Sequence, residues 1–115
     1  MGVPKERSEV LKGTLDLMVL KTLDALGPQH GYGIARRIEQ LSQDLLRLNE
    51  GTIYASLLRL TQKGWIQSKW GASDSNRKAK FYRLTAKGRK RLIAETTRWK
   101  QMTRAIGLIL GESAE

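Results

Sequence analysis

The stretch from Gly51 to Lys87 constrains the fold most, because a helical pattern passes directly into two short strand patterns. In GTIYASLLRLTQKG, the residues Ile53, Leu57 and Leu60 recur at the spacing of one helix face. Residues 65–70 and 79–84 have strand character, and a polar segment rich in turn-forming and basic residues joins them. A helix beside a basic β-hairpin is a compact way to grip duplex DNA, since the helix fits the major groove and the hairpin reaches the backbone.

The patterns before this stretch predict two further helices. Apolar residues at helical spacing indicate a first helix over residues 10–26, although Thr14 after Gly13 could cap a later start. A tight Gly-rich connection follows, in which we expect His30 to cap or pack rather than to catalyse. The second helix is expected over residues 33–41.

The remaining boundaries complete the order helix, helix, helix, strand, strand, helix. Residues 42–48 fit either a short strand or the tail of a helix. Asn49–Thr52 offers N-cap chemistry for the third helix, which ends before Gly64. Thr85 is a good N-cap for a last helix over residues 86–110. This order predicts a mainly α fold with a small β-hairpin, namely a winged helix-turn-helix with an added C-terminal helix.

The third helix carries a candidate base-reading face. At 100° per residue, the side opposite Ile53 holds Thr52, Ala55, Arg59 and Gln62, with Ser56 and Lys63 on its flank. Arg59 could pair bidentately with guanine, and Gln62 with adenine. Tyr54 lies between the two faces, either packing or reaching a phosphate through its hydroxyl.

The hairpin adds cations at and beside its tip, which suit contacts with phosphates or the minor groove. Trp65 and Trp70 are expected to pack the hairpin onto the helices. The candidate DNA-binding residues are therefore Thr52, Tyr54, Ala55, Ser56, Arg59, Gln62 and Lys63 on the helix, and Lys69, Asn76, Arg77, Lys78 and Lys80 on the hairpin.

The last helix is longer than a small core requires, and apolar residues recur along it every seven positions. This pattern is typical of a coiled-coil seam, so we expect its outer half to pair with a second subunit; packing on the chain's own first helix is the alternative, and both can hold. A dimer would place two recognition helices on successive major grooves of a palindromic site. The expected interface residues are Leu92, Thr96, Trp99, Met102, Thr103, Ile106, Ile109 and Leu110.

Composition narrows the classes of function. The formal net charge is +10, and between Lys63 and Lys100 only Asp74 and Glu95 oppose the cations, which favours a polyanionic partner. The chain has no Cys and one His, so we expect no disulfide, metal or cofactor. No nucleophile–base pair, carboxylate dyad or phosphate-cradling loop indicates an enzyme. The polar N-terminus and the lack of a long apolar run predict a cytoplasmic protein without a membrane anchor.

Six short motifs occur in the order and spacing of a known family, across residues 11–92. They are GTLDL from Gly13, HGYGI from His30, GTIY from Gly51, Leu57–Leu60, KGWI from Lys63, and YRLT from Tyr82 followed by Gly88-Arg89. The chain resembles the PadR family of bacterial transcription regulators, specifically the small PadR-like subgroup with a single C-terminal helix. It departs from the usual pattern with Ala55 in place of Pro, Gln62 in place of Glu, and a longer hairpin turn.

The resemblance implies a dimeric winged helix-turn-helix protein, usually a repressor, that binds double-stranded DNA and dimerises through its last helix. It also implies that a small hydrophobic effector can bind between the subunits, where Trp99 would line the pocket. The expected organisation is a disordered arm over residues 1–9, a DNA-binding domain over 10–85 and a dimerisation helix over 86–111. The alternatives are a non-specific nucleic-acid binder, associated with the nucleoid or with RNA, and a membrane-surface binder using the last helix.

Overall fold

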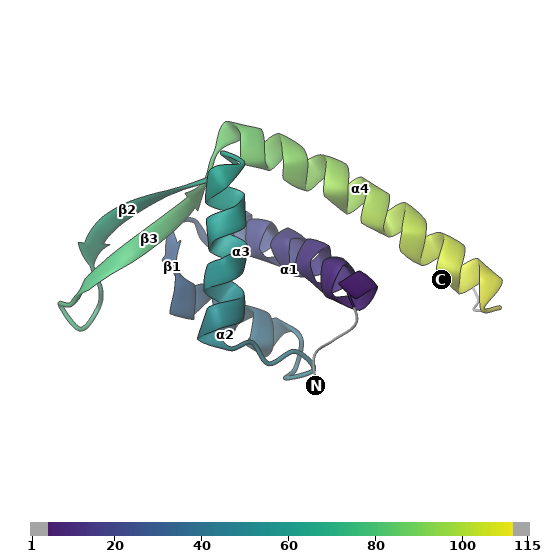
Figure 1. Cartoon of the computed structure of the whole chain (residues 1–115), viewed down its shortest axis with the longest axis horizontal. Coiled ribbons are helices and arrows are strands. Elements are labelled where there is room, and N and C mark those ends of the chain that lie inside the picture. Colours follow the sequence, from purple (N-terminus) through teal and green to yellow (C-terminus); the bar gives the residue numbers. More distant parts are fainter. Residues whose placement is uncertain (1–4, 112–115) are drawn as a thin grey trace.

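Three helices, a three-stranded antiparallel sheet and a long C-terminal helix follow one another in the structure (Figure 1). The computed structural model describes the backbone of residues 5–111 and the side chains of residues 12–111. The elements are α1 (Lys5–Leu26), β1 (Gln29–His30), α2 (Gly31–Leu41), α3 (Glu50–Gln62), β2 (Ile66–Ala72), β3 (Lys78–Leu84) and α4 (Ala86–Ile109). The predicted winged helix-turn-helix with an added helix is confirmed.

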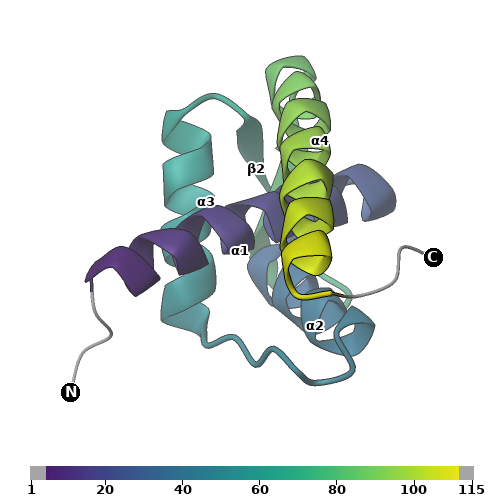
Figure 2. The same cartoon turned by 90° about the vertical axis from the view of Figure 1, so that its right-hand side faces the viewer.

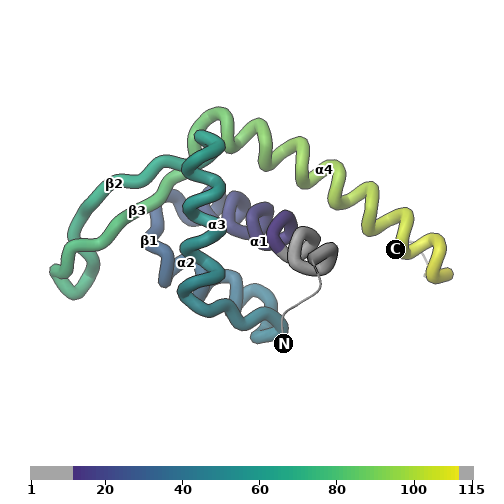
Figure 3. The backbone as a smooth tube through the Cα atoms, in the orientation of Figure 1, coloured from purple at the N-terminus to yellow at the C-terminus, as the bar shows by residue number. Residues whose placement is uncertain are grey.

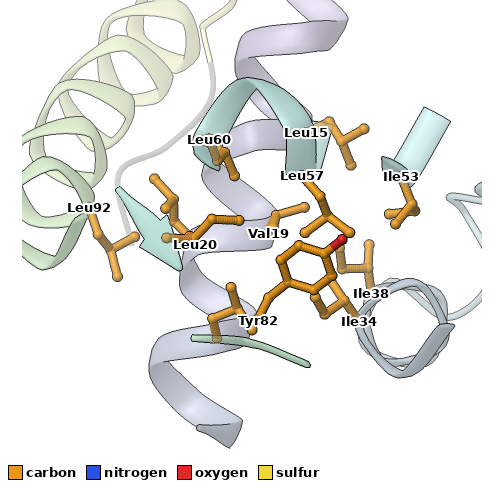
Figure 4. Packing of buried hydrophobic residues seen from close by; sticks show 12 residues of the cluster. Leu15, Val19, Leu20, Ile34, Ile38, Ile53, Leu57, Leu60, Tyr82 and Leu92 are labelled. Atoms are coloured by element: carbon orange, nitrogen blue, oxygen red, sulfur yellow. The ribbon is translucent and has the colours of Figure 1, made fainter. Parts of the chain in front are cut away.

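Helix α1 lies at the centre of the molecule and contacts α2, α3 and α4 (Figure 2). Leu15, Val19, Leu20 and Leu23 bury its inner face, and the apolar faces of α2 and α3 close over them (Figure 4). Tyr82 and Ile66 extend this core to the base of the hairpin. Burial of one such aliphatic side chain stabilises the fold by about 1.5–3 kcal/mol. Because α3 packs on this core, the core determines which face of α3 is exposed to solvent.

The strand order is β1-β3-β2, so the short first strand adds an edge that the sequence did not predict. Gln29 pairs with Tyr82 and His30 with Phe81, within the segment that the sequence indicated as a Gly-rich turn. The His30 imidazole caps α2, as predicted, because its Nδ1 accepts a hydrogen bond from the Gly33 amide at 3.0 Å. This edge pairing starts α2 at Gly31 and ties its N-terminus to the hairpin.

Two other boundaries differ from prediction. Residues 1–4 of the expected disordered arm lie outside the described residues, whereas residues 5–9 belong to α1, which begins earlier than predicted. Residues 42–48 form a loop, because Gln43 and Asp44 adopt positive φ angles of 53° and 62° that neither a helix nor a strand accepts. The Leu48 amide donates to the Glu39 carboxylate at 3.0 Å, which holds this loop beneath α3.

The junction between the hairpin and α4 is tightly packed around Gly88. A Cβ placed on Gly88 would lie 1.9 Å from the Trp65 carbonyl oxygen, so this position has no room for a side chain. Thr85 caps α4 as predicted, accepting from the Gly88 amide at 3.0 Å, and its own hydroxyl donates to the Gly64 carbonyl at 2.8 Å. These contacts fix the direction in which α4 leaves the core, and Figure 3 shows the helix and the hairpin extending to opposite sides of it.

Candidate nucleic-acid interface

Helix α3 presents one face to the core and the other to solvent. Asn49 caps it, with its side-chain oxygen accepting from the Thr52 amide at 2.8 Å, and Glu50 lies in its first turn, where a negative charge is favourable. The buried residues are Ile53, Ser56, Leu57 and Leu60. The exposed side chains are those of Glu50, Thr52, Tyr54, Ala55, Leu58, Thr61 and Gln62, followed by Lys63 at the C-cap.

Ser56 does not belong to the exposed face that the sequence predicted, because its side chain is fully buried. Its hydroxyl donates to Asp16 Oδ1 on α1 at 2.6 Å. Because Ser56 faces α1 rather than solvent, its assignment to the DNA-binding set is wrong.

Arg59 is engaged by the same carboxylate. Its Nε donates to Asp16 Oδ2 at 3.1 Å and its Nη2 to Asp16 Oδ1 at 2.7 Å, which is a bidentate pair. Only 27% of the Arg59 side chain is exposed. The predicted bidentate pairing with guanine would require Arg59 to leave Asp16, which is buried and would lose its charged partner. We call Asp16, Ser56 and Arg59 the α1–α3 clamp.

Leu58 is a residue that sequence reasoning missed. It is 60% exposed and lies on the side of α3 between Ala55 and Gln62. An apolar side chain there suits contact with a thymine methyl group in the major groove. The helical wheel contained this signal, since Leu58 lies about 140° from Ile53, but an apolar residue is easily assigned to the core.

Tyr54 is half exposed and joins α3 to the start of α2. A Cβ on Gly31 would lie 3.2–3.3 Å from the Tyr54 ring and hydroxyl, so the absence of a side chain at Gly31 admits the phenol. Burial, and to a lesser extent the neighbouring Tyr54, raises the pKa of Tyr82 above its ordinary value. Tyr54 and Tyr82 both line one groove beside the hairpin.

The hairpin has an inner and an outer face, which the strand register defines. Trp70 pairs with Lys80 and Ala72 with Lys78, so these side chains share the inner face that Tyr82 continues into the core. Lys69 pairs with Phe81 and lies on the outer face. The predicted hairpin cations are thus divided between the two faces. The turn is closed by the Asn76 amide donating to the Ser73 carbonyl at 2.8 Å, with Asn76 at a φ of 59°.

Trp70 does not pack the hairpin onto the helices, because 58% of it is exposed. Figure 3 shows the tip of the hairpin extending past the helices, and the inner-face residues nearest the tip, Ala72 and Lys78, are exposed as well. Lys78 Nζ and Lys80 Nζ lie 5.3 Å and 5.9 Å from the centre of the Trp70 ring. Trp65, by contrast, is partly buried against the core, as predicted.

A groove runs between the inner face of the hairpin and the N-terminal ends of α2 and α3. Tyr32 and Tyr54 line one side of it, and the hairpin lines the other with Trp70, Arg77, Lys78, Lys80 and the acidic residue Asp74. In the part of the chain that the structure describes, none of Lys63, Arg77, Lys78 or Lys80 pairs with a carboxylate. Their charges therefore remain available to a polyanion.

Along α4 the predicted interface residues divide into two groups. Leu92 is buried in the chain's own core, so it is not an exposed interface residue. Thr96 is partly buried, whereas Trp99, Met102, Thr103, Ile106, Ile109 and Leu110 are exposed. An Asp24–Arg89 ion pair at 3.4 Å also ties the start of α4 to α1. The first turns of α4 therefore pack within the chain itself. The outer half of the helix carries a stripe of exposed apolar side chains.

Residues 19–94 match the model of the transcriptional regulator PadR-like family. The chain belongs to this family. It is similar in structure to a transcriptional regulator from Clostridium thermocellum, with 27% identity, a TM-score of 0.76 and coverage of 86% of this chain and 95% of the other. A PadR-like regulator from Bacillus cereus has 25% identity, a TM-score of 0.76 and coverage of 91% and 99%. An uncharacterized protein of Lysinibacillus sphaericus is 28% identical over 104 residues, covering 90% of this chain and 94% of the relative.

The protein is therefore a PadR-like transcriptional regulator with a DNA-binding winged helix fold. The matched residues include α2, α3 and the hairpin and end two positions after Leu92, so they omit the exposed outer half of α4. Among residues 12–111 no cluster of His, Cys, Asp or Glu could hold a metal ion. No helix in the described part of this regulator is long and apolar enough to cross a membrane.

Proposed function

We propose that this PadR-like regulator is a homodimeric repressor that binds a palindromic operator in the cytoplasm. The observation that carries the proposal is the exposed face of α3, which bears no acidic side chain beyond its first turn and continues into the cationic inner face of the hairpin. An acid-free helix face with hydrogen-bond donors and small side chains suits the major groove.

The proposed roles follow from the side chains. Thr52, Ala55, Leu58 and Gln62 lie toward the base edges, with the Gln62 amide suited to adenine. Tyr54 and Lys63 contact phosphates at the two ends of the helix, and Asn76, Arg77, Lys78 and Lys80 do so from the hairpin. Lys69 faces away from this surface, so it is left out of the proposed contacts together with Ser56 and Arg59, which are bound to Asp16.

The apolar stripe on the outer half of α4 supports the homodimer. Trp99, Met102 and Ile106 are 47–54% exposed at helical spacing of three and four residues, and Ile109 is 83% exposed. A stripe of this kind is costly in water and is typical of a helix that pairs with another subunit. Trp99 lies within it and is the proposed contact for a small hydrophobic effector bound between subunits.

DNase footprinting upstream of the protein's own gene tests the proposal. We expect two protected half-sites about 34–36 Å apart, one per subunit, and a dimer in sedimentation at micromolar concentration. A monomer on a single half-site would overturn the dimeric part of the proposal.

A second function is favoured by one specific observation. The α1–α3 clamp occupies Arg59, which removes the side chain best suited to guanine recognition from the exposed face. A protein with a net charge of +10 but without an exposed arginine for guanine recognition fits a non-specific nucleic-acid binder. Uniform protection along the DNA, without discrete half-sites, would support this second function.

A further inference from the structure

We propose that Trp70 is a DNA-contacting residue, whose ring packs against the deoxyribose sugars of the duplex strand that enters the groove between the hairpin and the recognition helix. This inference rests on the proposed DNA-binding function and adds a specific aromatic contact to it. It reassigns Trp70, which we expected from the sequence to pack the hairpin onto the helices.

The position of Trp70 separates it from the core. Ser68 and Tyr82 form the last inner-face pair whose members are both at least partly buried, and Trp70–Lys80 is the next pair toward the tip. Trp70 is 58% exposed although it carries one of the largest apolar side chains in the protein. Exposure of so large a ring on a hairpin costs free energy in the isolated chain, and a ligand that covers it recovers that cost.

The surroundings of Trp70 favour a nucleic-acid strand as the ligand. The ammonium groups of Lys78 and Lys80 lie within cation–π distance of the ring, which holds both charges at the rim of the same groove. Tyr32 and Tyr54 line the opposite side, at 63% and 50% exposure. The cations beside the ring suit the phosphates of a nucleic-acid backbone, and the exposed aromatic rings suit its sugars.

The groove is also continuous with the exposed face of α3, since Tyr54 belongs to both. A duplex whose major groove received Ala55 and Gln62 would therefore bring a backbone strand past Tyr54 and toward Trp70. This continuity favours duplex DNA over a separate single-stranded ligand.

The test compares the wild-type protein with Trp70→Ala, Trp70→Phe and Lys80→Gln, using fluorescence anisotropy on a footprinted duplex at several salt concentrations. Lys69→Gln is the matched control, because it removes the same charge from the outer face of the hairpin. We expect Trp70→Ala to weaken duplex binding about tenfold and Trp70→Phe, which keeps an aromatic ring, to retain most of the affinity. Lys80→Gln should reduce the slope of log K against log salt by about 0.9 per hairpin, and Lys69→Gln should change it little.

Tryptophan emission supplies a readout that a purely structural role would not move. DNA should quench the wild-type emission, and Trp70→Phe should lose much of that quenching, because Trp70 is the tryptophan that lines the groove. Melting temperatures and sedimentation of each variant should match the wild type, since exposed positions contribute little to stability.

Several outcomes would overturn the inference while leaving the proposed function intact. One is wild-type affinity and quenching in both Trp70 variants. Others are a loss confined to single-stranded DNA, or a change in oligomeric state that would make Trp70 a contact between copies of the chain. Failure of the wild type to bind any duplex would instead overturn the proposed function and the inference together.

Discussion

Substitution of Asp16 by Ala should weaken the fold strongly, although it replaces no residue of α3. The side chain accepts three hydrogen bonds, one from the Ser56 hydroxyl and two from the Arg59 guanidinium, at 2.6–3.1 Å. Its removal leaves the Ser56 hydroxyl buried without an acceptor. It also leaves Arg59 with no charged partner at a site where only 27% of that side chain is exposed.

The magnitude follows from these contacts. A buried hydroxyl without a partner costs about 1–3 kcal/mol, and loss of a hydrogen bond between charged groups costs about 1.5–3 kcal/mol. Arg59 can partly rehydrate after the substitution, which offsets part of the second cost. We therefore expect Asp16→Ala to lower the free energy of unfolding by about 3 kcal/mol, out of roughly 5–15 kcal/mol for a domain.

The assay is a double-mutant cycle of Asp16→Ala and Arg59→Ala, measured by urea unfolding followed by circular dichroism. We expect a coupling energy of at least about 1 kcal/mol, because the two side chains contact each other directly. Arg89→Ala is the matched control, since it breaks the ion pair between Arg89 of α4 and Asp24 of α1, in which the arginine is 65% exposed. That change should cost no more than about 1 kcal/mol.

One combination of results would refute the role of the α1–α3 clamp. It is a coupling energy near zero together with a loss of affinity in Arg59→Ala that is confined to the operator sequence. Arg59 would then be a base-reading residue in the bound state, and its pairing with Asp16 would not stabilise the fold.

Three further predictions concern the fold and the assembly. Gly88→Ala should destabilise the protein by roughly 2 kcal/mol or more, because the added Cβ would clash with the Trp65 carbonyl. Thermal melting should show no such loss for Gly13→Ala, where the added Cβ meets no atom within 4 Å. Ile106→Glu should yield a folded monomer in sedimentation, since it places a charge in the apolar stripe; an unchanged dimer would argue against that interface. The raised pKa of Tyr82 predicts a contribution to stability that is present below the unfolded-state pKa of about 10 and is lost as pH rises through the folded-state pKa. Tyr82→Phe should therefore flatten the decline of the free energy of unfolding at alkaline pH. Identical pH profiles for the two proteins would contradict this.

The order of elements could be predicted from the sequence because each boundary has a local cause. Asn49 and Thr85 accept hydrogen bonds from the first turns of their helices, and Gly27 and Gly64 adopt positive φ angles of 77° and 75° at helix ends. Strand β1 was missed because two residues contain no periodic pattern. It forms only because β3 offers an edge to pair with.

The candidate site was less predictable, because a helical wheel shows which residues share a face but not what packs against its flank. Ser56 and Arg59 lie on the flank that meets α1, and their partner Asp16 is 40 and 43 positions away in the chain. A clue was present, since an acidic residue within the apolar run around Leu15 and Val19 needs a buried partner. The identity of that partner follows only from the tertiary structure.

The same limitation applies to Trp70 and Leu92. Trp70 lies on the inner face of the hairpin, where it pairs with Lys80, but the sequence does not reveal where the helices beneath that face end. The heptad repeat along α4 groups Leu92 with Trp99 and Ile106, although of these three residues only Leu92 belongs to the chain's own core.

The most direct test of the account is the ratio of affinities for the footprinted operator and for a scrambled duplex of equal length, measured at physiological salt. The account predicts a ratio of at least about 10³, as expected for a protein that reads bases, and a decrease of that ratio in Gln62→Ala and Leu58→Ala. Equal affinity for both duplexes, with the same salt dependence, would contradict it and leave a regulator that binds DNA through charge alone.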